Sequence, residues 1–263
     1  MIAGVAMKRS DFNKFKKTLY SPSIDAFVKS MCMADFFDGK EKILAIGDCF
    51  GREFDALEGL GKEVHILDLS PQERFKDFAR FYQQSICEKT TFPDNYFDGV
   101  VMVEVIEHLF EDRAALLEIN RILKPDGVLG ITVPYFNGNQ DFVEHHVRIH
   151  SHKTMRRLLE SAGFKITQHF YRGFVSQLPM NKLLGVPFLY VPRKILKTFL
   201  GSRGLNFFYR FFFNLERFLG KFQWVQKRFS SYGAILKAEK CQLVDYDKIQ
   251  VRDFSDRTSD FAR

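Results

Sequence analysis

The chain alternates short apolar runs with stretches of helical spacing, and this alternation restricts the fold more than any other feature. The apolar runs are bounded by glycine, aspartate or charged residues, as buried strands of a parallel sheet are. Between them lie segments with apolar residues three and four apart. We therefore predict an α/β fold with a doubly wound, mostly parallel sheet. The predicted strands are residues 42–47, 64–68, 98–103, 127–133, 165–171 and 232–240, and the predicted helices are 51–61, 70–81, 111–123 and 152–164.

These elements place one domain over residues 1–240 of the 263. Its first 40 residues indicate a polar-to-amphipathic helical segment, broken at Ser21–Pro22. Residues 174–230 form an insertion before the last strand, and residues 241–263 are a polar tail. A hydrophobic fraction of 46% supports a globular core and excludes a disordered or fibrous chain.

The four cysteines lie far apart, and none forms a CxxC pair. This usage favours reduced thiols in a cytosol over a disulfide framework or a zinc ribbon. No stretch reaches about 18 uninterrupted apolar residues, so we expect no transmembrane helix. We expect a cytoplasmic protein.

The carboxyl end of the first predicted strand has the features of a ligand site. The strand ends in the glycine-flanked segment Gly47–Gly51, and a helix follows directly. Asp68 ends the second strand, where a carboxylate can accept both hydroxyls of a ribose. A tight turn and a solvated aspartate would give the same pattern. Cys49 breaks the G-x-G-x-x-G fingerprint, which disfavours a dinucleotide and a nicotinamide oxidoreductase. A ligand with adenosine and no phosphates fits better.

Three blocks of sequence carry a family resemblance: FPDNYFDGVVMVEVIEHL (92–109), RILKPDGVLGITVP (121–134) and HHVRIHSHKTMRRLLESAGF (145–164). In these blocks the chain resembles the class I S-adenosylmethionine-dependent methyltransferases of the "methyltransferase 11/23" type. The resemblance implies a seven-stranded, Rossmann-like sheet and S-adenosyl-L-methionine as cofactor. It also implies the cofactor-binding residues, which are Gly47 and Gly51 at the methionine moiety, Asp68 and Leu69 at the ribose, Ile86 and Cys87 at the adenine, and Glu104.

The chain departs from the family at three positions. Ala45 replaces the usual acidic residue, Cys49 replaces the central glycine, and Ile86 stands where an aspartate contacts adenine. We expect Asp48 to supply the missing carboxylate for the cofactor's ammonium group. These departures also favour the alternative of a non-catalytic, methyltransferase-like protein that binds a membrane or a partner through its insertion.

The chemistry-bearing candidates follow the third long strand in the pattern E-x-x-E-H, formed by Glu104, Glu107 and His108. Their spacing predicts one shared helical face. With His145 or His146 they could hold a divalent cation. Resemblance to metal-assisted O-methyltransferases, including ubiquinone-biosynthesis and small-RNA 2′-O-methyl enzymes, selects His146 and Mg²⁺ or a similar ion. Two alternatives remain: the glutamates only fix the loop, or His146 or His108 is a general base.

The insertion carries the charge of the protein. Residues 174–230 contain ten basic residues, one acid and eleven of the 30 phenylalanines, so their formal charge is +9 and the rest of the chain is −2. Residues 207–222 have the spacing of a basic amphipathic helix. The alternatives are a helical lid over the substrate and peripheral association with an anionic inner-membrane surface. Nucleic acid is disfavoured. We expect a small or lipid-linked hydroxylated substrate, of the glycan or prenylated-quinol type. The sequence does not indicate an oligomeric state.

Overall fold

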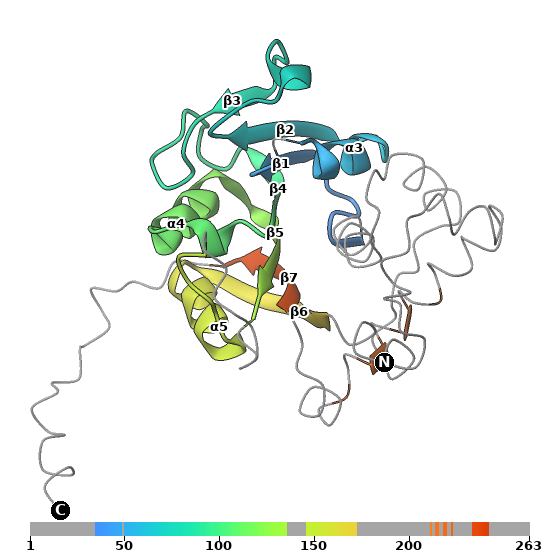
Figure 1. Cartoon of the computed structure of the whole chain (residues 1–263), viewed down its shortest axis with the longest axis vertical. Helices are drawn as coiled ribbons and strands as arrows, with labels where there is room; N and C mark the ends of the chain where they lie inside the picture. Colours follow the sequence, from blue (N-terminus) through green and yellow to red (C-terminus); the bar gives the residue numbers. More distant parts are fainter. Residues whose placement is uncertain are drawn as a thin grey trace, which may run out of the picture.

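A computed structural model of the chain describes residues 35–48, 50–135, 146–172 and 233–241, together with Phe211, Asn214, Leu215, Phe218, Leu219 and Phe222. Its core is a seven-stranded sheet in the order β3-β2-β1-β4-β5-β7-β6 (Figure 1). The strands are β1 (Lys42–Ile46), β2 (Glu63–Asp68), β3 (Phe81–Gln83), β4 (Phe97–Val103), β5 (Leu123–Pro134), β6 (Phe164–Arg172) and β7 (Gly233–Lys240). The predicted α/β sheet is confirmed.

Only β7 breaks the parallel arrangement, because it pairs antiparallel with both β5 and β6. The other ladders, from β3 through β2, β1 and β4 to β5, are parallel. The chain order reverses between β1 and β4, since β2 lies on one side of β1 and β4 on the other. In open α/β sheets, ligands bind outside the carboxyl ends of the strands at such a reversal, which here are the ends of β1 and β4. We call this end of the sheet the carboxyl edge.

Helices cover both faces of the sheet. Figure 1 shows α3 (Arg52–Glu58) on one face and α4 (Asp112–Ile122) with α5 (His152–Ser161) on the other. Ser151 caps α5 in a capping box with Thr154. The core between the sheet and α4 and α5 is built from fully buried aliphatic side chains such as Leu116, Ile131 and Leu159. Within the described residues, these helices and strands confirm the expected elements apart from one.

The helix expected over residues 70–81 is wrong. The segment contains only the 3-10 helix η1 (Glu73–Phe75), and β3 begins at Phe81. Phe75, Phe78 and Phe81 form an aromatic cluster, in which the ring centroids of Phe75 and Phe81 are 6.1 Å apart. Phe75 and Phe78 pack against Phe54 of α3, which curves the chain tightly. The curved segment ends where β3 pairs with β2. Tertiary packing here overrides the helical spacing.

Two phenylalanines anchor the turn that precedes β4. Phe92 and Phe97 are both buried, and their rings meet edge to face with centroids 4.8 Å apart. Asn95 adopts a left-handed conformation with φ 56°, which asparagine tolerates well.

Several expectations fall outside the described residues: the helical segment before residue 35, the tail after Cys241 and most of the insertion. Within the insertion, the described residues between 211 and 219 are helical, and Phe211 and Phe218 are exposed. Among the residues described, none of the helices is both long and apolar enough to span a bilayer.

Candidate functional site

Gly47 turns the chain at the end of β1 and brings two loops of the carboxyl edge into contact. Its φ is +72°, and its N–H donates to the carbonyl of Leu67 at 3.0 Å. A Cβ on Gly47 would lie 2.5 Å from Cγ2 of Val105, in the loop that follows β4. Glycine is therefore required here both for its backbone conformation and for the close approach of Val105.

Asp48 shapes the loop that leads into α3. Its two carboxylate oxygens accept hydrogen bonds from the N–H groups of Arg52 and Phe54, both at 2.7 Å. The side chain is buried, and burial followed by the charge of Glu53 raises the pKa of the Asp48 carboxyl well above its ordinary value. Its predicted contact with the cofactor's ammonium group stays a prediction. In the structure the carboxylate caps the amino end of α3, because it accepts two N–H groups of the first helical turn.

Arg52, the first residue of α3, interacts electrostatically with three acidic side chains. Burial lowers the pKa of Arg52, but the charges of Glu53, Asp48 and Glu104 outweigh it and raise the pKa. The Nε atom of Arg52 lies 2.5 Å from Oε1 of the buried Glu53. The sequence analysis did not single out Arg52 or Glu53. Only their place in the first turn after the glycine segment could have indicated them.

Asp68 and two exposed apolar residues lie at the next part of the carboxyl edge, at the ends of β2 and β1. The half-buried Asp68 ends β2, and its Oδ1 accepts the N–H of Ser70 at 3.1 Å. Leu69 and Phe50 follow β2 and β1 and are 68% and 75% exposed. A carboxylate beside large exposed apolar side chains suits a ribose with an attached base.

Ile86 and Cys87 lie in the loop after β3. Ile86 is 4% exposed and packs into the core, so its side chain contributes no open surface. Cys87 is half-buried, and burial raises the pKa of its thiol. Their predicted place beside the adenine stays a prediction.

Glu104 follows β4 in a left-handed conformation with φ 54°, which is strained for a residue with a side chain. Its Oε1 accepts a hydrogen bond from the Thr132 hydroxyl at 2.7 Å, and its N–H donates to the same hydroxyl at 3.0 Å. The expected helical face shared by Glu104, Glu107 and His108 is therefore wrong. Glu104 stands before the 3-10 helix η2 (Ile106–His108) and turns to β5.

Glu107, His108 and His146 lie together as one cluster, which we call the carboxylate–imidazole group. One potential ligand atom from each residue lies within 4.8 Å of the others. The two imidazole rings meet edge to face, with centroids 4.9 Å apart. Glu107 is 1% exposed, whereas His108 is exposed. Three of the four residues predicted as metal ligands are thus brought together, and Glu104 is not among them.

The backbone of Glu107 holds the two halves of this group in place. Its carbonyl accepts the N–H groups of Val147 at 2.8 Å and Arg148 at 3.2 Å, which fixes the segment after His146 against η2. Arg148 also forms an ion pair with the buried Asp112 at 2.7 Å. Asp112 is the first residue of α4, so the helix contributes to the position of His146.

Comparison with known proteins identifies the fold. Residues 44–131 match the family described as "Methyltransferase domain". This part of the chain is a methyltransferase domain. No curated protein matches the chain in sequence.

Two solved structures share the fold of this methyltransferase domain. An S-adenosylmethionine-dependent methyltransferase from Archaeoglobus fulgidus is 18% identical, with a TM-score of 0.57 over 81% of this chain and 93% of its own. The 1,6-didemethyltoxoflavin-N1-methyltransferase of Burkholderia thailandensis was solved with 1,6-didemethyltoxoflavin and S-adenosylhomocysteine. It is 16% identical, with a TM-score of 0.53 over 89% of this chain and 85% of its own. At these identities the two likenesses show a shared fold.

The carboxyl edge of the methyltransferase domain has features that suit S-adenosylmethionine. Gly47 and Gly51 both have φ +72°. Because glycine has no Cβ, the loop between β1 and α3 adopts this backbone conformation without strain. Asp68 is half-buried and Leu69 is exposed at this edge, and their predicted place at the ribose stays a prediction. The three acidic side chains around Arg52 suit a ligand with cationic groups.

Proposed function

We propose that the domain methylates a hydroxyl oxygen, with the carboxylate–imidazole group beside the acceptor. The observation that carries this proposal is the cluster itself. An exposed imidazole, a second imidazole and a buried carboxylate converge at the carboxyl edge of the sheet. A hydroxyl must lose its proton during or before attack on a methyl group, and an imidazole next to a carboxylate is suited to take it.

S-adenosylmethionine supplies a methyl group on a sulfonium, and the bond between the methyl carbon and sulfur breaks as the new carbon–oxygen bond forms. The chain's own residues orient the hydroxyl and accept its proton. His108 is the exposed imidazole, and its ring packs edge to face against the ring of His146. The Glu107 carboxylate, buried beneath them, stabilises the imidazolium that results.

Substitutions in the carboxylate–imidazole group test whether its residues take part in proton transfer. Glu107→Gln, His108→Ala and His146→Ala are each expected to lower kcat at least about 100-fold, the usual range for loss of a general acid–base catalyst. Binding of S-adenosylhomocysteine, measured by calorimetry, should stay within severalfold of wild type. Glu111→Gln removes an exposed carboxylate three residues after His108 and is the matched control. Full activity in His146→Ala and His108→Ala would refute the proposal.

A second candidate role for the same three side chains is a divalent-cation site. Two imidazoles and one carboxylate within 4.8 Å form a donor set that suits a first-row transition metal better than Mg²⁺. A bound cation would lower the pKa of the acceptor hydroxyl. Loss of turnover with EDTA and recovery with one added metal would favour this role. Turnover that is indifferent to chelation would favour the general base.

We infer a small or lipid-linked hydroxylated acceptor from the charge and apolar character of the insertion. Residues 173–232 leave the sheet after β6 and return at β7, and Arg172 pairs with Gly233. Both ends of this +9, phenylalanine-rich region are thus adjacent on the sheet. Phe211 and Phe218 are exposed and could enter a membrane interface, while the basic residues of the insertion would be attracted to anionic lipids.

Two measurements test this inference. Methyl transfer from labelled S-adenosylmethionine should label prenylated quinols or lipid-linked glycans more strongly than water-soluble amines. Vesicles of phosphatidylglycerol should co-sediment the wild-type protein, and Phe211→Ser/Phe218→Ser should reduce that binding. An absence of binding to these vesicles would remove the membrane surface from the proposal, and labelling of amines alone would exclude O-methylation.

A further inference from the structure

A pocket of about 550 Å³ opens at the end of the sheet opposite to the carboxyl edge. Its lining comes from the turn before β4, the end of α4, the start of β5 and the end of the antiparallel β7. These are the amino ends of the parallel strands, so the pocket is separate from the site of methyl transfer. Its volume lies in the range of sites for small molecules. The lining residues are Asp94, Asn95, Leu117, Asn120, Arg121, Pro125, Lys240 and Cys241.

Lys240 gives the pocket a net positive charge, because the other two charged residues of the lining, Asp94 and Arg121, pair with each other. Its Nζ donates to Oδ1 of Asn95 at 2.9 Å and to the carbonyl of Leu123 at 2.6 Å, both of which are neutral oxygens. Within the part of the chain that the structure describes, no carboxylate forms an ion pair with it. Burial lowers the pKa of Lys240, and the charge of Asp94 only partly opposes this effect. An ammonium has three N–H groups, so one remains for a ligand.

Other lysines at this end of the sheet differ from Lys240. Lys40 pairs with Asp126 at 2.6 Å, and Lys124 pairs with Asp98 at 2.7 Å. A half-buried cation that faces only neutral oxygens is stabilised by an anion that enters its pocket. The charge imbalance at Lys240 is therefore local to the pocket.

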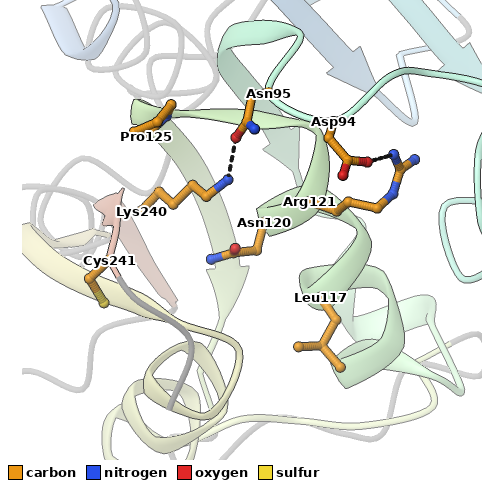
Figure 2. A pocket seen from close by; sticks show the side chains of 8 residues that line it. All are labelled: Asp94, Asn95, Leu117, Asn120, Arg121, Pro125, Lys240 and Cys241. Carbon is orange, nitrogen blue, oxygen red and sulfur yellow. Dashed lines mark hydrogen bonds and ion pairs between the residues drawn. The ribbon is translucent and has the colours of Figure 1, made fainter. Parts of the chain in front are cut away.

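The rest of the lining also favours an anion. Figure 2 shows Lys240, Asn95 and Asn120 around the middle of the pocket, with Asp94 and Arg121 to one side and Cys241 to the other. Asn120 uses one amide N–H on the carbonyl of Gly163 at 3.0 Å and has a second N–H to offer.

Arg121 has an acidic partner on each side, Asp94 at 2.5 Å and Glu118 at 2.6 Å, so its charge is balanced. Leu117 and Pro125 add apolar surface to the same lining.

We propose that this pocket binds a small organic carboxylate, whose anionic group pairs with Lys240 and whose apolar body rests on Leu117 and Pro125. The proposal is independent of the methyl-transfer reaction, because the pocket shares no residue with the carboxyl edge. An apolar wall next to a single unbalanced cation favours a carboxylate with a hydrocarbon part over inorganic phosphate.

Benzoate is the probe, and calorimetry on the full chain measures its binding. Benzyl alcohol has nearly the same shape without the charge, and inorganic phosphate has charge without the apolar body. We expect benzoate to bind more tightly than either. Lys240→Met should weaken benzoate at least about tenfold, as loss of a charged hydrogen bond does. Lys237→Met, on the same strand and outside the pocket, is the matched control and should bind like wild type.

The thiol of Cys241 gives a second readout in the unmodified protein. Cys241 is exposed and lines the pocket, so saturating benzoate should slow its alkylation by iodoacetamide severalfold. Peptide mass spectrometry separates it from Cys87, which lies outside the pocket and should react at an unchanged rate. Cys241→Asp places a carboxylate beside Lys240 at an exposed position and should compete with benzoate. This variant tests the charge while the hydrogen bonds of Lys240 stay in place.

Several results would overturn the proposal. They are an absence of benzoate binding to the folded wild type, binding of benzyl alcohol or phosphate as tight as that of benzoate, an equal loss in Lys237→Met, and no protection of Cys241. Binding of S-adenosylhomocysteine in the same samples reports on the carboxyl edge. A failure of the pocket is thereby distinguished from a failure of the methyltransferase site.

Discussion

Gly47→Ala is expected to destabilise the fold through two separable effects. The first is the left-handed backbone at φ +72°, which costs a residue with a side chain about 1–2 kcal/mol. The second is the new Cβ, which would lie 2.5 Å from Cγ2 of Val105. Val105 is β-branched and moves little without its backbone, so overpacking adds about 1–3 kcal/mol. The expected total loss in the free energy of unfolding is about 2–5 kcal/mol.

Gly39→Ala separates these two effects. Gly39 has the same φ of +72°, and a Cβ there would meet no atom within 4 Å. The control should therefore show only the backbone cost. Urea denaturation of both variants measures the difference, which we attribute to contact with Val105.

A double-mutant cycle tests that attribution. Val105→Ala removes both methyl groups that the new Cβ would meet, so Gly47→Ala should cost less in the Val105→Ala background by about 1 kcal/mol or more. Because Val105 directly precedes η2, Gly47→Ala should also weaken S-adenosylhomocysteine binding and lower kcat, whereas Gly39→Ala should leave both unchanged. Equal costs for the two glycine substitutions, or strict additivity in the cycle, would refute the reasoning.

Three further predictions concern titration and the loop after β4. Burial, and then the charges of His152 and Arg156, lower the pKa of His169 to about 3. Below about pH 6.5 the His169 imidazole is protonated in the unfolded chain but stays neutral in the folded chain. The free energy of unfolding therefore falls as pH drops, with a limiting slope of about 1.4 kcal/mol per pH unit. His169→Leu should flatten urea-derived stability between about pH 6 and 4, and an unchanged slope would contradict this. Asp48 has a raised pKa, so the folded chain holds its proton more tightly and stability is lost as pH rises above the ordinary aspartate value. The deficit of Asp48→Asn relative to wild type should therefore narrow from acid to neutral pH, and a widening deficit would exclude the pKa shift. Thr132→Val removes both hydrogen bonds to Glu104 and should cost about 1–3 kcal/mol by thermal unfolding, whereas a neutral effect would show that Glu104 is held by other groups.

The central strands of the sheet were predictable because they are buried on both faces. Continuous apolar runs such as those of β1 and β4 have few alternatives in a chain of this length, and glycine or aspartate ends them clearly. The segment before β3 was not predictable by the same signals. Its phenylalanines have spacing typical of a helix, but their contacts with Phe54 are long-range and leave no local trace in the sequence.

The candidate site was predictable as a set of residues and only partly as a geometry. Glu107, His108 and His146 converge as the E-x-x-E-H pattern and its later histidine indicate. Glu104 does not join them, because its left-handed φ turns it to Thr132. Such a conformation for a glutamate depends on surrounding tertiary contacts, which residue spacing does not encode.

The hydrogen-bonded pairing of Arg172 with Gly233 means that the intervening 60 residues begin and end at neighbouring positions on the sheet. Two antiparallel strands in this register can equally be joined by a tight hairpin. The sheet could therefore accept insertions of different length between β6 and β7 at little entropic cost, in natural lineages or in engineered proteins. The selectivity of the enzyme could thus diverge while the machinery that handles the sulfonium nucleoside is inherited unchanged.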